Sequence, residues 1–124
     1  MRSKRMQILI LLSLVLAACQ QGAEIRIDQK DGHATFSLSR ISSDKPACIR
    51  NLEVYEGEPK GGQPLWQIAG GDEGCIASVE FAKVPQGFSQ ADDTPAGLKL
   101  KPGQSYAVQA SGTGWLAFGA FTAR

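Results

Sequence analysis

Apolar and polar residues alternate with a period of two along much of the chain after residue 22. In residues 34–39, for example, Ala34, Phe36 and Leu38 fall on one face, and threonine or serine residues fall on the other. Alternation of this kind is typical of a β-strand with one buried face. The same pattern, interrupted by turns that contain glycine or proline, predicts strands at 23–28, 34–39, 48–56, 65–69, 75–84, 98–101, 106–110 and 115–122.

The pattern predicts an all-β fold. No stretch of sufficient length repeats apolar residues at helical spacing with helix-favouring residues and caps. The turn at 30–32 predicts a hairpin between the first two strands, and residues 85–95 form the longest stretch without periodicity. We therefore expect one domain at residues 23–124, a small antiparallel β-sandwich with about seven to eight strands.

The last quarter of the chain carries a resemblance to a known architecture. Leu100, Pro102, Gly103, Tyr106 and Val108 resemble the tyrosine corner of immunoglobulin-like and fibronectin type III sandwiches. In that corner a tyrosine near the start of a strand hydrogen-bonds back to the preceding backbone. The resemblance implies an immunoglobulin-like sandwich. A buried tyrosine after an ordinary Pro-Gly turn is the other interpretation, and a transthyretin-like sandwich is the other architecture considered.

The start of the chain has the composition of an export signal. Arg2, Lys4 and Arg5 precede an apolar run at residues 8–16, which only Ser13 interrupts. A basic segment followed by a short apolar segment is typical of a secretory signal peptide. The run is shorter than the roughly 20 residues that a membrane-spanning helix needs. We therefore expect residues 1–18 to be a cleaved leader.

The expected leader ends on a short motif of a leucine, two small residues and a cysteine. Leu16, Ala17, Ala18 and Cys19 resemble the lipobox of bacterial lipoproteins. The resemblance implies a diacylglyceryl group on the Cys19 thiol, cleavage before Cys19 and acylation of the new amino terminus. Gln20 replaces the aspartate that retains many lipoproteins in the inner membrane, which favours the periplasmic face of the outer membrane. Plain cleavage that leaves a free Cys19 is the alternative.

Residues 19–22 would then be a short tether, and two cysteines would remain in the domain. Once Cys19 carries lipid, Cys48 and Cys75 can pair in an oxidising compartment, which we favour over two buried thiols. The only histidine is His33, and the cysteines lack the spacing of a zinc site. We therefore expect a disulfide between Cys48 and Cys75, and no metal.

Charge and motifs exclude several classes of function. The leader holds three of the 13 basic residues and none of the 12 acidic ones, so residues 19–124 carry a net charge of −2. Such a chain has no basic surplus for nucleic acid.

His33 lies beside a turn, where a solvated or structural role is usual. The carboxylate pairs at 72–73 and 92–93 lie in loops, and neither resembles a loop that supplies the six or more oxygens of a Ca²⁺ site. No cofactor motif is present, so we expect neither an enzyme nor a cofactor.

A rigid β-domain on a short lipid tether suits a non-catalytic binding or structural role in the cell envelope. We expect the lipid on Cys19 to anchor the domain to the membrane, and its partner to be a protein. Two alternatives stay open. One is inhibition of a periplasmic hydrolase, since small disulfide-bonded β lipoproteins that block lysozyme are similar in size and architecture. The other is an assembly subunit of a secretion or envelope complex.

The candidate partner-binding surface is the long loop that contains Phe88, Asp92 and Asp93. An exposed Phe88 could anchor a partner, since aromatic residues concentrate at binding hot spots. We favour the other interpretation, in which Phe88 packs its loop onto the core, because exposed large apolar side chains are infrequent. On the same reasoning Trp66 and Trp115 are expected in the core.

Overall fold

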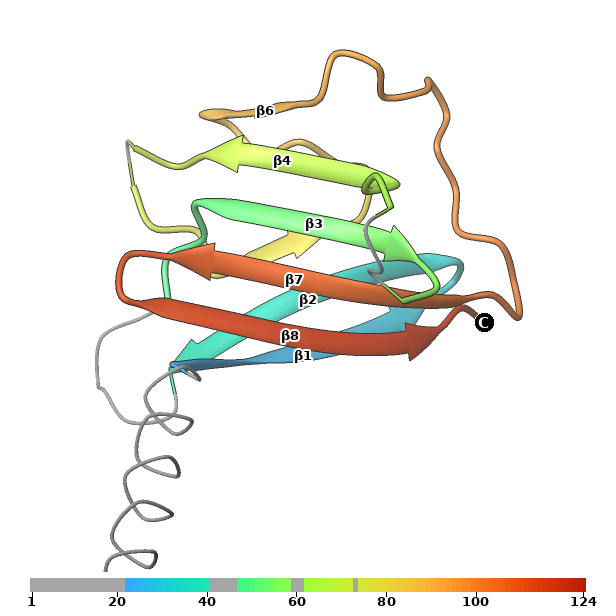
Figure 1. The fold of residues 1–124 in the computed structure, drawn as a ribbon, viewed down its shortest axis with the longest axis horizontal. Coiled ribbons are helices and arrows are strands. Elements are labelled where there is room, and N and C mark those ends of the chain that lie inside the picture. Colours follow the sequence, from blue (N-terminus) through green and yellow to red (C-terminus); the bar gives the residue numbers. More distant parts are fainter. Residues whose placement is uncertain (1–21, 41–46, 59–61, 73) are drawn as a thin grey trace, which may run out of the picture.

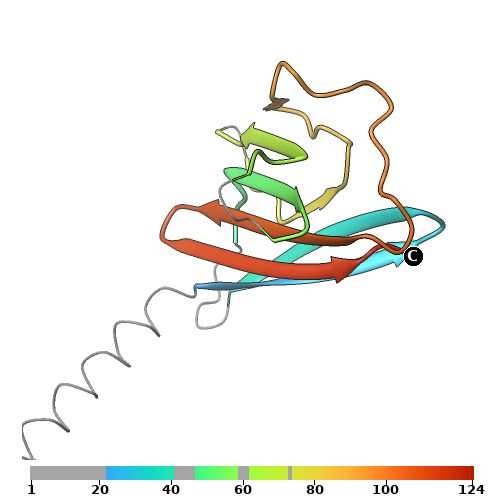
Figure 2. The ribbon, with the colours of Figure 1, turned by 45° about the vertical axis from the view of Figure 1, so that its right-hand side comes forward.

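The computed structural model describes residues 22–40, 47–58, 62–72 and 74–124. The predicted leader at 1–18 and the predicted lipidation site Cys19 lie outside these residues, as does most of the tether. The described residues form two antiparallel sheets that pack face to face, shown as two layers in Figures 1 and 2. The predicted all-β antiparallel sandwich is confirmed.

The smaller sheet has the strand order β1-β2-β5. The first two strands pair along their whole length, from Ala23 opposite Arg40 to Lys30 opposite His33. A two-residue turn joins them, in which both Asp31 and Gly32 have positive φ, as a tight hairpin turn requires. The predicted hairpin is confirmed. The strands are β1 (Ala23–Lys30), β2 (His33–Arg40) and β5 (Ser78–Glu80).

The larger sheet has the strand order β6-β4-β3-β7-β8. Its last two strands form a second hairpin in full register, from Ser105 opposite Thr122 to Gly112 opposite Trp115. The edge strands β1 and β8 of the two sheets lie side by side (Figures 1 and 2). The strands are β3 (Asn51–Glu56), β4 (Trp66–Gly70), β6 (Phe88–Gln90), β7 (Ser105–Gly112) and β8 (Trp115–Thr122).

The core lies between the two sheets and is built from the inward positions that the alternation predicts. No polar or charged residue is buried among the residues that the structure describes, and Trp66 and Trp115 are both buried, as expected. Burying these side chains is the main favourable contribution to folding. The inward residues of the long strands are Ala34, Phe36 and Leu38 on β2, Leu52 and Val54 on β3, Trp66 and Ile68 on β4, Tyr106, Val108 and Ala110 on β7, and Trp115 and Ala117 on β8.

The strands predicted at 48–56 and 75–84 are shorter in the structure, at 51–56 and 78–80. Two further segments differ in kind. Residues 98–101 alternate between half-buried and exposed but form no strand, because no strand among the described residues pairs with their backbone. Within the segment 85–95, which has no periodicity, residues 88–90 form the short strand β6 by pairing with the edge of β4. Side-chain alternation reports burial, whereas a strand also requires a partner for its backbone.

Cys48 and Cys75 form a disulfide, as predicted. Their Cα atoms are 4.8 Å apart, and each residue lies on a connection that leads toward a strand, one to β3 and the other to β5. Beside the bond, the amide of Ile49 donates to the carbonyl of Ile76 at 2.9 Å. The disulfide therefore ties together the two sheets at one end of the sandwich. It indicates an oxidising, extracytoplasmic compartment.

Tyr106 makes the hydrogen bond that the tyrosine-corner resemblance implies. Its hydroxyl accepts a hydrogen bond from the backbone amide of Lys101 at 2.8 Å, and the residue is only 1% exposed. The tyrosine ring stacks on Phe121 of β8, with ring centroids 5.4 Å apart. This contact fixes the end of the long segment between β6 and β7 against the start of β7.

Candidate binding groove

A groove of about 680 Å³ opens at the end of the sandwich where β1 meets β2. We call it the end groove. Its volume falls in the range of sites that bind small molecules. It is lined by the hairpin turn at residues 29–34, by Phe81 after β5, by Leu98, Lys99, Leu100 and Pro102, and by Ala123 and Arg124 after β8.

The floor of the end groove is apolar because four chain segments expose the margin of the core there. Ala34, Phe81 and Ala123 are buried residues of the core cluster, and Leu98 and Leu100 pack half-buried against it. The alternation at 98–101 therefore has a structural consequence, since the leucines face the core and the lysines face solvent. The segment is held in place by the contact between Tyr106 and Lys101.

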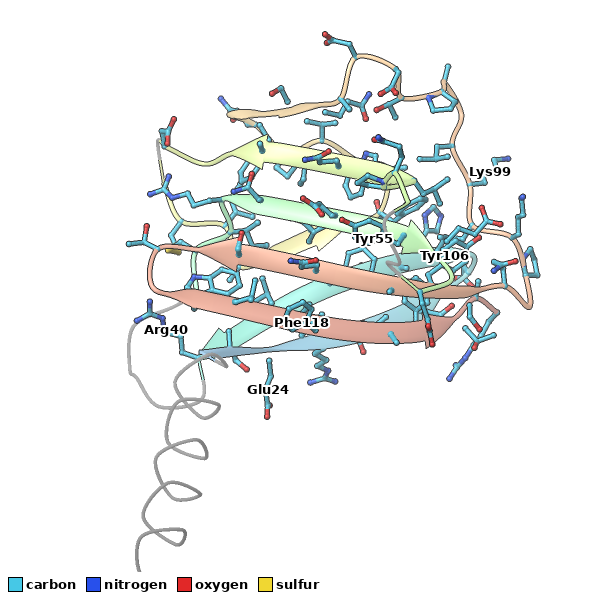
Figure 3. All side chains as sticks on the ribbon, in the orientation of Figure 1. Glu24, Arg40, Tyr55, Lys99, Tyr106 and Phe118 are labelled. Carbon is cyan, nitrogen blue, oxygen red and sulfur yellow. A yellow bond between two sulfur atoms is a disulfide. The ribbon has the colours of Figure 1, made fainter. Side chains whose placement is uncertain are left out.

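The rim of the end groove is mostly cationic. Lys30, Lys99 and Arg124 are exposed there, and Asp31 is the one carboxylate side chain among the lining residues. Figure 3 shows Lys99 on the segment that borders this end of the molecule. In the part of the chain that the structure describes, none of these four side chains forms an ion pair. Lys101, by contrast, lies outside the lining and pairs with Glu56 at 3.7 Å.

His33 also borders the end groove, and its imidazole lies beside the carboxylate of Glu80 at the end of β5. Its Nδ1 lies 3.3 Å from a carboxylate oxygen of Glu80, whose other oxygen accepts from the Lys83 ammonium at 2.6 Å. The hydrogen bond from Lys83 lowers the pKa of Glu80, and the charges of Lys83 and His33 act in the same direction. Over the described ranges, no three His, Cys, Asp or Glu side chains group closely enough to hold a metal ion.

The loop residues singled out by the sequence lie elsewhere. Phe88 is half-buried and packs against the core, the interpretation favoured above, and its ring sits so close to Gly71 that a Cβ there would be 2.9 Å from the Phe88 Cζ. Asp92 and Asp93 are exposed. Asp93 borders a second, smaller depression of about 360 Å³ beside Trp66. The structure therefore packs Phe88 against the core and leaves Asp92 and Asp93 exposed.

The outer face of the larger sheet has features that the sequence reasoning missed. Phe118 on β8 is 57% exposed, opposite Gln109 of β7 (Figure 3). On β3, Tyr55 donates a hydrogen bond to Glu53, which together with burial and the charge of Glu53 raises the pKa of Tyr55 to about 12. A strict period of two along β8 could have shown that Phe118 faces away from Trp115 and Ala117.

No helix among the described residues has the length and apolar character needed to cross a membrane. Comparison of the chain with protein-family models, with curated proteins and with solved structures finds no match.

Proposed function

We propose that the protein is a lipid-anchored, non-catalytic binding module of the bacterial cell envelope, and that the end groove is its binding surface. One observation carries this proposal. The end groove combines an apolar floor with exposed cations, and it lies at the end of the sandwich opposite the start of the domain. An apolar cavity with a few polar groups is the usual form of a ligand site.

The positions of Ala23 and Lys30, at the two ends of β1, support an end groove that faces away from the predicted anchor. Strand β1 runs from Ala23, next to the predicted tether, to Lys30 on the rim of the end groove. A strand of this length spans roughly 23 Å. Arg40, which pairs with Ala23, and Lys99 lie at opposite ends of the molecule in Figure 3. The predicted tether of four residues, 19–22, spans at most about 10–15 Å when extended. A domain anchored through Cys19 would therefore hold its end groove away from the bilayer.

The location is the second part of the proposal. The disulfide supports an oxidising compartment. The sequence pattern at 16–19 supports a lipid on Cys19, and Gln20 supports the periplasmic face of the outer membrane. Acyl chains contribute about 0.8 kcal/mol for each buried methylene, so two or three chains hold a small domain without a spanning helix.

Fractionation and intact mass test the anchor. The full chain is expressed in a bacterium with two membranes beside a Cys19→Ser variant. We expect the unmodified sequence in the outer membrane, with its amino terminus at residue 19 and the mass of the acyl groups on that residue. The variant should lack the lipid mass. An unmodified thiol at residue 19 in a soluble product would contradict the anchor.

A further inference from the structure

We infer that the end groove binds a small amphiphile with one carboxylate on an apolar body. This inference rests on the proposed binding function and specifies its ligand class. The floor of the end groove is apolar and its rim is charged, so the two parts select different halves of a ligand.

The floor selects an apolar body. Leu98 and Leu100 are only half-buried, so part of each side chain stays in contact with water above the buried Phe81 and Ala34. A ligand that covers these surfaces removes them from water, which is favourable in proportion to the apolar area covered. A bare anion such as phosphate would cover none of this area. The end groove therefore favours a ligand with a hydrocarbon part.

The rim selects a negative head group. The lining holds three cationic side chains, Lys30, Lys99 and Arg124, and one carboxylate side chain, that of Asp31. The α-carboxylate of Arg124, the last residue, adds a second negative charge, so the rim keeps a positive surplus of one charge. None of the four side chains forms an ion pair within the described part of the chain, so no bridge must break before a ligand binds. These charges are exposed, so their attraction for an anion weakens as salt rises. A cationic amphiphile with the same body would be repelled.

The test uses a chain of residues 20–124. Every buried hydrophobic residue that the structure describes lies between Ala23 and Ala123, and both cysteines of the disulfide lie within this range, so the shortened chain keeps this core. Octanoate, octanol and octylammonium share one body and differ in the head group. Octanoate and octylammonium are titrated below their micelle concentrations, and octanol below its solubility limit, into the isotope-labelled protein, and the amide shifts are followed by NMR.

Octanoate should shift the amides of Ala34, Leu98 and Leu100 and reach saturation. At low salt its dissociation constant should be at least about fivefold lower than that of octanol, and octylammonium should bind more weakly than octanol. Equal affinities for the three compounds, or saturable shifts only at a different surface such as the one around Phe118, would overturn the inference. Inorganic phosphate that shifts the same amides as strongly would also overturn it.

A matched pair of variants isolates the rim. Lys99→Gln should weaken octanoate binding about threefold and leave octanol binding unchanged. Lys101→Gln removes a lysine two residues away that does not line the end groove, and it should leave both affinities unchanged. Equal effects of the two variants would contradict a role for the rim.

The octanoate titration and the test for lipid on Cys19 give independent results. If Cys19 carries lipid and octanoate does not bind, the inference on the ligand is wrong and the anchor stands. If octanoate binds and Cys19 carries no lipid, the ligand class stands and the proposed location is wrong.

Discussion

The side-chain amide of Gln29 donates a hydrogen bond to the backbone carbonyl of Thr122 at 3.0 Å, and so joins the edges of the two sheets. The same amide accepts a hydrogen bond from the backbone N–H of Arg124, also at 3.0 Å. Gln29 lies on β1, and Thr122 is the last residue of β8. Strands β1 and β8 belong to different sheets and do not pair through their backbones. The side chain of Gln29 links them instead.

Replacing Gln29 with alanine should loosen this junction. Gln29→Ala removes both hydrogen bonds, which are partly exposed, so we expect the free energy of unfolding to fall by about 1 kcal/mol. Urea denaturation measures it. Glu24→Ala, an exposed substitution at the other end of β1, serves as the control and should change stability by less than about 0.5 kcal/mol. Equal effects of the two variants would show that the junction contributes nothing.

The hydroxyl of Tyr106 should matter more than that of Tyr55. Tyr106→Phe leaves the amide of Lys101 without its partner beside the core, which should lower the free energy of unfolding by about 1–2 kcal/mol. Tyr55→Phe removes a hydrogen bond at the surface of the sheet and should cost less than about 0.5 kcal/mol. Thermal unfolding of both variants measures the difference, and a reversed order would contradict the tyrosine corner as a stabilising contact.

The disulfide should contribute more than any single hydrogen bond. It closes a loop with a sequence separation of 27 residues. The loop-entropy model gives about 3–4 kcal/mol for a loop of this size. Denaturation with and without a reducing agent measures the effect. The double variant Cys48→Ser, Cys75→Ser is the control, because its stability should not respond to the reducing agent. A protein whose stability is the same in both states would refute the expectation.

Alkaline titration should detect the contact between Tyr55 and Glu53. The pKa of Tyr55 is raised to about 12, first by its hydrogen bond to Glu53. A raised pKa means that the folded protein holds the phenol proton more tightly than the unfolded chain. This contribution to stability is therefore complete below about pH 10 and is lost as the pH rises through about 12.

Absorbance of the phenolate follows this titration. Glu53→Gln keeps an acceptor but removes the negative charge, so the midpoint of one tyrosine should move down toward 10. Lys101→Gln, which acts on Glu56 instead, should leave the midpoint in place. If Glu53→Gln leaves both tyrosine midpoints unchanged, the contact does not set the pKa.

Local patterns predicted much of the fold. The alternation of Ala34, Phe36 and Leu38 identified an inward face, and the tight turn after Lys30 identified a hairpin. Such patterns suffice because a strand with one buried face repeats every two residues, whatever its neighbours are. The pairing of Cys48 with Cys75 also followed from counting, once Cys19 was assigned to lipid.

Local sequence patterns could not predict the order of the strands in the sheets or the position of β6. Phe88, Ser89 and Gln90 form a strand only because the edge of β4 offers them backbone partners. Conversely, Leu98 and Leu100 alternate with lysines and yet form no strand, because no partner runs beside them. The end groove depended on the fold even more strongly, because its lining residues are far apart in the sequence, whereas Phe88, Asp92 and Asp93 are close together along the chain.

The sequence by itself determined the class of fold, the inward faces and the two cysteines that pair, because each depends on spacing along the chain or on residue type. Only the tertiary structure decided the end groove, which gathers Lys30, Phe81, Lys99 and Arg124 from four separate segments. The physical reason is that a cavity and its charge arise from how sheets pack at their margins. That packing depends on contacts between residues far apart in the chain.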